Sequence, residues 1–246
     1  MLTVHQGRLA GLIAQVALLA ALAGTVGLGA PGGLVGLGYG MAVVGLLSRA
    51  LGRSGAAVLG PADLVTLARS VLVGGVAALV ADSFSGPVSL GALTALAVAA
   101  LVLDAVDGRV ARWTRTVSPV GARFDMEVDS VLVLLLSMYA ARSLGVWVLA
   151  VGSVRYVRWI AGRVLPWLRG PVPRRYWCKV VAAVQGIVLT AVVSGALPRA
   201  LAVLMLLLVA ALLAESFGRE AWWLWRRSRV GSEDDVAPRA VGSFRG

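Results

Sequence analysis

The sequence predicts an all-α protein, a polytopic bundle of about eight transmembrane helices. Of its 246 residues, 59% are hydrophobic and only 14% are charged, and the mean hydropathy is +0.87. Soluble domains carry about 25% charged residues. Several apolar runs approach or exceed the roughly 18–20 residues that cross a bilayer core. Because no long polar stretch separates these runs, we expect one membrane domain.

The first two helices are expected within residues 1–60. Residues 9–29 form an apolar run that follows His5 and Arg8. We expect this run to be retained as a helix; the alternative is a signal peptide cleaved after Ala30, because small residues precede that position. Residues 34–51 form a second run, whose many glycines suit close helix packing.

Six further helices are expected in a membrane domain over residues 61–227. Pro61 suits the first turn of a helix that runs to about Ala81. The next helices are expected from about 88 into an aspartate-rich motif, from that motif to about 139, and over 146–160, 176–193 and 201–217. The basic residues 162–175 are expected to form a loop, and residues 228–246 a disordered cytoplasmic tail.

The basic residues predict how the chain is oriented in the membrane. The net charge is +11, and Lys179 is the only lysine. With the N-terminus inside, alternate loops place only Arg142 and Arg199 outside, in keeping with the excess of basic residues in cytoplasmic loops. We therefore expect a plasma-membrane protein whose aspartates face the cytoplasm. Nucleic acid is not an expected partner, since no basic soluble module with interleaved aromatic residues is visible.

The single cysteine, Cys178, and the single histidine, His5, limit the chemistry available. One cysteine forms neither an intramolecular disulfide nor a thiolate metal site. One histidine near the N-terminus argues against a histidine zinc site or a Ser-His-Asp triad. Any metal ion must therefore be held by carboxylates.

Residues 104–129 hold four aspartates in the pattern D-x2-D-G-x2-A-R-x8-G-x3-D-x3-D. At about 100° per residue, this motif divides into faces on two consecutive helices. The first face holds Asp104, Asp107, Gly108 and Ala111. The second holds Gly121, Asp125 and Asp129. Because the link between the helices is short, we expect them to be antiparallel neighbours whose four carboxylates converge.

Four converging carboxylates indicate bound cations or protonation, since they cannot all stay ionised without compensation. Oxygen ligands favour Mg²⁺ or Mn²⁺, and two ions about 3.5–4 Å apart would clamp a pyrophosphate. The small residues Gly108, Ala111 and Gly121 leave room for a nucleotide against the backbone. Taken singly, such residues are more often a solvated helix end or a packing surface.

This spacing resembles the signature of the CDP-alcohol phosphotransferase family, integral membrane enzymes of phospholipid synthesis, at every fixed position. The resemblance implies a core of six helices, to which residues 1–60 would add two, and a possible homodimer. It implies transfer of a phosphoryl-bearing group from a CDP-linked donor to an alcohol, with release of CMP. It also implies that Asp104, Asp107 and Asp125 hold metal on the diphosphate. Asp129 would deprotonate the acceptor and also serve the second metal.

The resemblance also implies nucleotide contacts. Members often carry N-x2-T-x2-R on the preceding helix, and here Thr66 and Arg69 match while Asp63 replaces the asparagine. Arg112, the motif arginine, would support the site through a phosphate or an aspartate. The nucleotide-binding residues implied are Thr66, Arg69, Gly108, Ala111, Arg112 and Gly121.

The expected donor is CDP-diacylglycerol, and the expected acceptor is an alcohol such as a phosphorylated polyol, for example glycerol phosphate or inositol phosphate. Arg155, Arg158 and Lys179 are candidates for holding the acceptor phosphate. The alternative is that these cations only reflect the positive-inside bias.

Two other functions stay open from the sequence. One is transfer from a soluble CDP-alcohol to a lipid alcohol. The other is divalent-cation transport, since acidic residues in membrane helices also mark ion paths. The clustering of the aspartates at one membrane boundary argues against transport.

Overall fold

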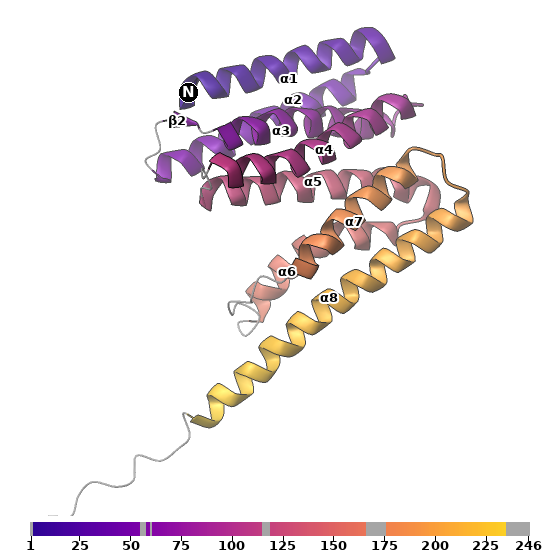
Figure 1. Ribbon diagram of the computed structural model, residues 1–246. Helices are drawn as coiled ribbons and strands as arrows, with labels where there is room; N and C mark the ends of the chain where they lie inside the picture. The colour runs from indigo at the N-terminus through magenta and orange to yellow at the C-terminus, as the bar shows by residue number, and fades with distance from the viewer. Residues whose placement is uncertain (1, 55–57, 60, 115–118, 166–175, 235–246) are drawn as a thin grey trace, which may run out of the picture.

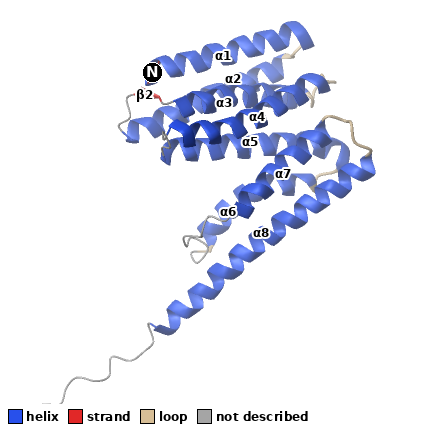
Figure 2. Cartoon of the chain, in the orientation of Figure 1, coloured by secondary structure: helices blue, strands red, loops and turns tan. Residues whose placement is uncertain are grey.

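The protein is a helical bundle in a computed structural model that describes residues 2–54, 58–59, 61–114, 119–165 and 176–234 (Figure 1, Figure 2). The helices are α1 (Val4–Val26), α2 (Ala30–Ser54), α3 (Pro61–Asp82), α4 (Leu90–Thr114), α5 (Pro119–Leu144), α6 (Val148–Val164), α7 (Tyr176–Val193) and α8 (Arg199–Asp234). The described strands, β1 (Leu2–Thr3) and β2 (Val58–Leu59), form one short antiparallel pairing. The predicted all-α class is confirmed.

The expected helices are all present, but several end later than hydropathy predicts. Helix α5 continues to Leu144, and α6 includes residues 162–164 of the expected loop. Helix α8 continues to Asp234, so it includes residues 228–234 of the expected tail. Hydropathy marks only the apolar part of a helix, whereas backbone hydrogen bonds continue through polar residues, helped by pairs such as Glu215 and Arg219. Residues 166–175 and 235–246 lie outside the described part.

Glycines with a left-handed backbone explain where three helices stop. Gly27, Gly145 and Gly195 have φ angles of 72°, 104° and 72°, and they follow α1, α5 and α7. A residue in this conformation closes the last turn of a helix, and only glycine adopts it without steric cost. Helix α5 therefore runs on to Gly145, where the backbone can turn.

The helices have the lengths and the apolar surfaces of a membrane bundle. Within the described part of the chain, four segments are long and apolar enough to cross a membrane, namely Gln6–Val26, Ala30–Arg49, Leu64–Asp82 and Arg199–Arg226. Leu90–Val106 and Val180–Val193 are shorter apolar segments. The predicted polytopic membrane architecture agrees with these findings.

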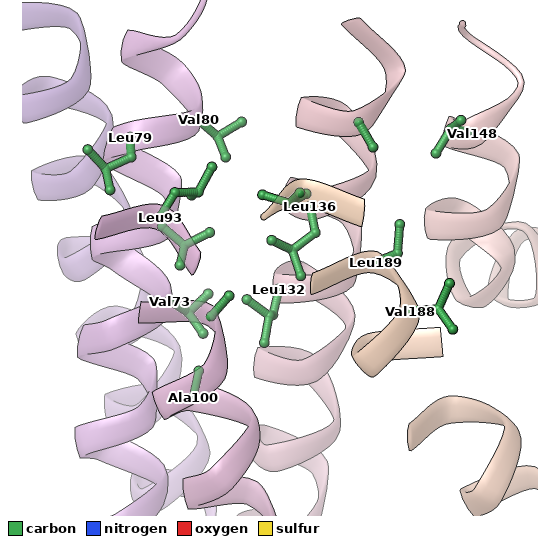
Figure 3. Close-up of a cluster of buried hydrophobic side chains, with 14 of the residues drawn as sticks. Val73, Leu79, Val80, Leu93, Ala100, Leu132, Leu136, Val148, Val188 and Leu189 are labelled. Atoms are coloured by element: carbon green, nitrogen blue, oxygen red, sulfur yellow. The ribbon is translucent and has the colours of Figure 1, made fainter. Parts of the chain in front are cut away.

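Helix α3 is the central element of the N-terminal part of the bundle. It packs against α1, α2, α4 and α5, and every residue from 73 to 80 is buried. In the main hydrophobic cluster, Val73 of α3 lies with Leu93 of α4, Leu132 of α5 and Leu189 of α7 (Figure 3). Since α3 is enclosed by neighbours, the side chains one turn before Val73 are held in fixed positions.

Helix α2 approaches its neighbours through a glycine. A Cβ atom added at Gly36 would lie 2.6 Å from Leu19 Cδ2 on α1 and 3.0 Å from the Ala78 Cβ on α3. Gly38, on the same helix, has no such neighbour within 4 Å. The close packing of α1, α2 and α3 therefore depends on the missing side chain at position 36.

We expect Gly36→Leu to lower the melting temperature of the detergent-solubilised protein relative to Gly38→Leu. Overpacking a helix contact costs about 1–3 kcal/mol, which corresponds to roughly 2–10 °C for a chain of this size. Tryptophan fluorescence during a thermal ramp measures the difference. Because both substitutions replace glycine by leucine in one helix, the comparison cancels the change in helix propensity. Equal melting temperatures would show that the three helices do not depend on contact at Gly36.

Candidate active site

Three of the predicted aspartates meet in one cluster. Asp104 lies on α4, and Asp125 and Asp129 lie one turn apart on α5. One carboxylate oxygen from each residue lies within 4.8 Å of the other two. The three side chains are between 34% and 41% exposed, so a ligand can reach them. The two helix faces expected from the motif therefore do converge at these residues.

The fourth aspartate and several motif residues cannot be placed to the same detail. Asp107 lies on α4, one turn after Asp104. Among the predicted site residues, the surroundings of Asp107, Gly108, Ala111, Arg112 and Lys179 fall outside the described part of the structure. Their roles in metal, nucleotide or acceptor binding stay predictions.

Arg69 of α3 joins the aspartate cluster, and its side chain is 0% exposed. Its Nη1 donates to the carboxylate of Asp104, and its Nη2 donates to the carboxylate of Asp125. Nη2 also donates to the backbone carbonyl of Asp125 at 3.1 Å and lies 3.4 Å from Asp129 Oδ1. One buried guanidinium thus links three helices through all three carboxylates.

The ion pairs of Arg69 were not predicted from the sequence. The available signal was an arginine inside an apolar span, because such a residue requires a polar partner within the bundle. The partners Asp104 and Asp125 are 35 and 56 residues away along the chain. Only the packing of α3 against α4 and α5 selects them.

Two other predicted nucleotide residues lie beside this cluster along their helices. Thr66 is buried on α3, one turn before Arg69. Gly121 is half-buried on α5, one turn before Asp125. Thr66 is thus next to Arg69 on its helix and Gly121 is next to Asp125, but a nucleotide contact for Thr66, Arg69 or Gly121 stays a prediction.

The candidate acceptor arginines of α6 are engaged in ion pairs. Arg155 Nη2 donates to Glu127 Oε1 at 2.7 Å, and Glu127 lies between Asp125 and Asp129 on α5. Arg158 Nη1 donates to Glu220 Oε2 of α8 at 2.6 Å. Sequence reasoning missed both glutamates. Arg155 is therefore near the aspartate cluster, whereas Arg158 ties α6 to α8.

The donor set of the cluster suits a hard divalent cation. The group found among the described residues consists of carboxylates alone, and carboxylate oxygens are preferred ligands of Mg²⁺ and Mn²⁺. Partial exposure leaves coordination positions for water or a phosphate. The cluster could therefore hold a metal ion next to a phosphorylated substrate.

Comparison with known proteins gives one match. The family model described as CDP-alcohol phosphatidyltransferase matches residues 60–224, about two thirds of the chain. The match covers α3 to α7 and most of α8, and with them the whole aspartate motif, while α1 and α2 precede it. Searches of curated proteins and of solved structures found no significant match. The chain therefore belongs to the CDP-alcohol phosphatidyltransferase family.

Proposed function

We propose that this protein transfers the phosphatidyl group of CDP-diacylglycerol to an alcohol and releases CMP. The observation that supports this most is the convergence of Asp104, Asp125 and Asp129 at one site in a chain of this family. A carboxylate cluster of this kind can hold cations against a diphosphate. The long apolar helices of the bundle support a donor that is itself a lipid.

The metal that we propose is Mg²⁺ or Mn²⁺, in two ions held by Asp104, Asp107, Asp125 and Asp129. The three described carboxylates lie close enough together for a shared cation. When bound, the ions would neutralise the diphosphate and stabilise the charge that develops on the departing phosphate.

Asp129 is the proposed general base. Its carboxylate would accept the proton of the acceptor hydroxyl as the acceptor oxygen bonds to the phosphorus of the phosphatidyl group. The bond from that phosphorus to the oxygen of CMP breaks in the same step, and CMP leaves as a phosphate monoester. No covalent enzyme intermediate is needed.

The nucleotide would lie along the small residues of the motif. Gly108, Ala111 and Gly121 would let it approach the backbone, and Thr66 and Arg112 would supply polar contacts. Arg69 would act on the nucleotide through the aspartates, because its guanidinium is buried against them. A homodimer, which the family resemblance implies, is part of the same proposal.

We propose that the site faces the cytoplasm from the plasma membrane. The basic residues support this orientation, because only Arg142, in the last turn of α5, and Arg199, at the start of α8, would lie at the other side. A water-soluble acceptor would then enter from the cytoplasm while the acyl chains of the donor stay in the bilayer.

One assay tests the proposed function. Purified protein is incubated with labelled CDP-diacylglycerol, Mg²⁺ or Mn²⁺, and a panel of alcohols with and without a phosphate group. Release of CMP together with a new phospholipid is the expected result. Turnover only with a soluble CDP-alcohol and a lipid alcohol would reverse the substrate assignment. Cation flux into vesicles without release of CMP would indicate a transporter instead.

We expect Arg155→Ala to raise the KM for a phosphorylated acceptor about tenfold or more. A hydrogen bond to a charged group contributes about 1.5–3 kcal/mol, and Arg155 lies beside the aspartate cluster through Glu127. Steady-state kinetics with varied acceptor measures the change. Arg163→Ala is the matched control, because Arg163 lies two turns further on α6 with its guanidinium over the Trp159 ring. An unchanged KM for Arg155→Ala would leave these arginines with a role in topology only.

A further inference from the structure

Among the described residues, the buried guanidinium of Arg69 has hydrogen-bond partners at Nη1 and Nη2 but none at Nε. Nη1 and Nη2 contact the carboxylates of Asp104 and Asp125, and Asp129 lies 3.4 Å from Nη2. Nε is buried and has no hydrogen-bond partner among the described residues. The described hydrogen bonds and ion pairs of the guanidinium are therefore all directed at the aspartate cluster.

The positive charge of Arg69 does not balance the negative charges of the three aspartates. Three carboxylates carry a charge of −3 when ionised, and Arg69 supplies +1. An arginine is charged at any physiological pH, and a buried charge without a partner is costly. Carboxylates this close together also repel one another. Arg69 and the aspartates thus stabilise one another, and when all three carboxylates are ionised these four described side chains carry a net charge of −2, which attracts a divalent cation.

The position of Arg69 is set by the fold. It lies one turn before Val73 on α3, the helix that packs against α1, α2, α4 and α5. The following residues, 73 to 80, are all buried. A guanidinium on such a helix cannot swing away from the cluster as an exposed side chain would.

We infer that Arg69 is the internal counter-ion of the aspartate cluster: it holds the three carboxylates together when no divalent metal is bound, and the metal binds against its charge. This inference rests on the metal site of the proposed function. The counter-ion role predicts that loss of Arg69 strengthens metal binding. A role of Arg69 in packing, or in orienting the aspartates as metal ligands, does not predict this.

Thermodynamic linkage makes this role measurable without an activity assay. Removal of Arg69 takes its positive charge away from the three carboxylates in the metal-free protein, whereas a bound divalent cation compensates them. The variant therefore loses more stability without metal than with metal. By linkage, the same difference appears as tighter metal binding.

The test compares Arg69→Gln with the wild type by Mn²⁺ titration followed by electron paramagnetic resonance, and by melting temperature with and without Mn²⁺. We expect Arg69→Gln to melt at a lower temperature without metal, to gain more from Mn²⁺ than the wild type does, and to bind Mn²⁺ about tenfold more tightly. Arg69→Lys, which keeps the charge, should bind Mn²⁺ nearly as the wild type does. Arg142→Gln is the control, because Arg142 stacks on Phe84 and Tyr139, away from the cluster.

A compensating variant covers the case in which Arg69→Gln does not fold without metal. Adding Asp104→Asn to Arg69→Gln returns the net charge of the group to −2. We expect this double variant to melt at a higher temperature without metal than Arg69→Gln alone, or to be recovered folded where the single variant is not.

Three results would overturn the inference. They are equal losses of stability with and without Mn²⁺, weaker Mn²⁺ binding by Arg69→Gln, and a double variant no more stable than the single one. If the wild type transfers phosphatidyl groups while any of these holds, the counter-ion role fails and the proposed function stands. A wild type that binds no Mn²⁺ would overturn both the counter-ion role and the metal site.

Discussion

Replacing Asp129 by asparagine is expected to abolish phosphatidyl transfer while sparing the binding of CDP-diacylglycerol. Asparagine has nearly the same shape but cannot accept the proton of the acceptor hydroxyl. Loss of a general base typically costs about 10²–10⁴-fold in rate. Asp104 and Asp125 remain in place to hold the cluster, so the donor should bind within a few fold of the wild-type affinity. CMP release and equilibrium binding of the labelled donor measure the two quantities.

The control for Asp129→Asn is Glu215→Gln, which removes one negative charge on α8. Glu215 pairs with Arg219 at 2.6 Å, outside the aspartate cluster, so this variant should transfer at nearly the wild-type rate. Retained activity in Asp129→Asn would remove Asp129 as the base. Loss of donor binding together with activity would make Asp129 mainly a metal ligand.

The second large effect is expected for Asp125→Asn, which should weaken Mn²⁺ binding at least about tenfold. Changes to residues that only support a metal ligand cost about 10–100-fold in metal affinity or activity, and a ligand itself should cost no less. Asp125 also accepts hydrogen bonds from Arg69 at its carboxylate and at its backbone carbonyl, so its position is well defined. Activity measured against metal concentration should shift to higher concentrations or vanish. Complete chelation of divalent metal should stop the wild type as well.

Asp82→Asn is the matched control for this experiment. Asp82 ends α3 and accepts a hydrogen bond from the Gly29 amide at 2.9 Å, which an asparagine oxygen can also accept. This variant should bind Mn²⁺ as the wild type does. If Asp125→Asn keeps the wild-type metal dependence, the metal is held elsewhere and the assignment of Asp125 as a ligand fails.

Much of the fold follows from patterns that are local in the chain. Apolar runs of membrane-spanning length predict the helices and their order, because a bilayer core requires about 20 such residues. Helices α5 and α8 end later than the apolar runs predict, because hydropathy does not show where the backbone hydrogen bonds of a helix stop. Gly145 closes α5, and α8 continues as a helix through polar residues to Asp234.

The candidate site also combines features that the sequence predicts with contacts that depend on packing. The motif faces could be read from the sequence because residues three or four apart share one side of a helix. Asp104, Asp125 and Asp129 do meet. The partners of Arg69, Arg155 and Arg158 could not be read, since each ion pair joins helices whose side-by-side placement depends on packing.

That this chain is a helical membrane protein of the CDP-alcohol phosphatidyltransferase family, with an aspartate-rich motif suited to a metal ion, follows from the sequence alone. These features depend on composition and on short spacings along one helix or two consecutive helices. The ion pairs of Arg69 with the aspartates, and those of Arg155 and Arg158 with glutamates, depend on tertiary packing. Such contacts join residues 28 to 62 positions apart, and close packing around α3 and between α5, α6 and α8 brings them together.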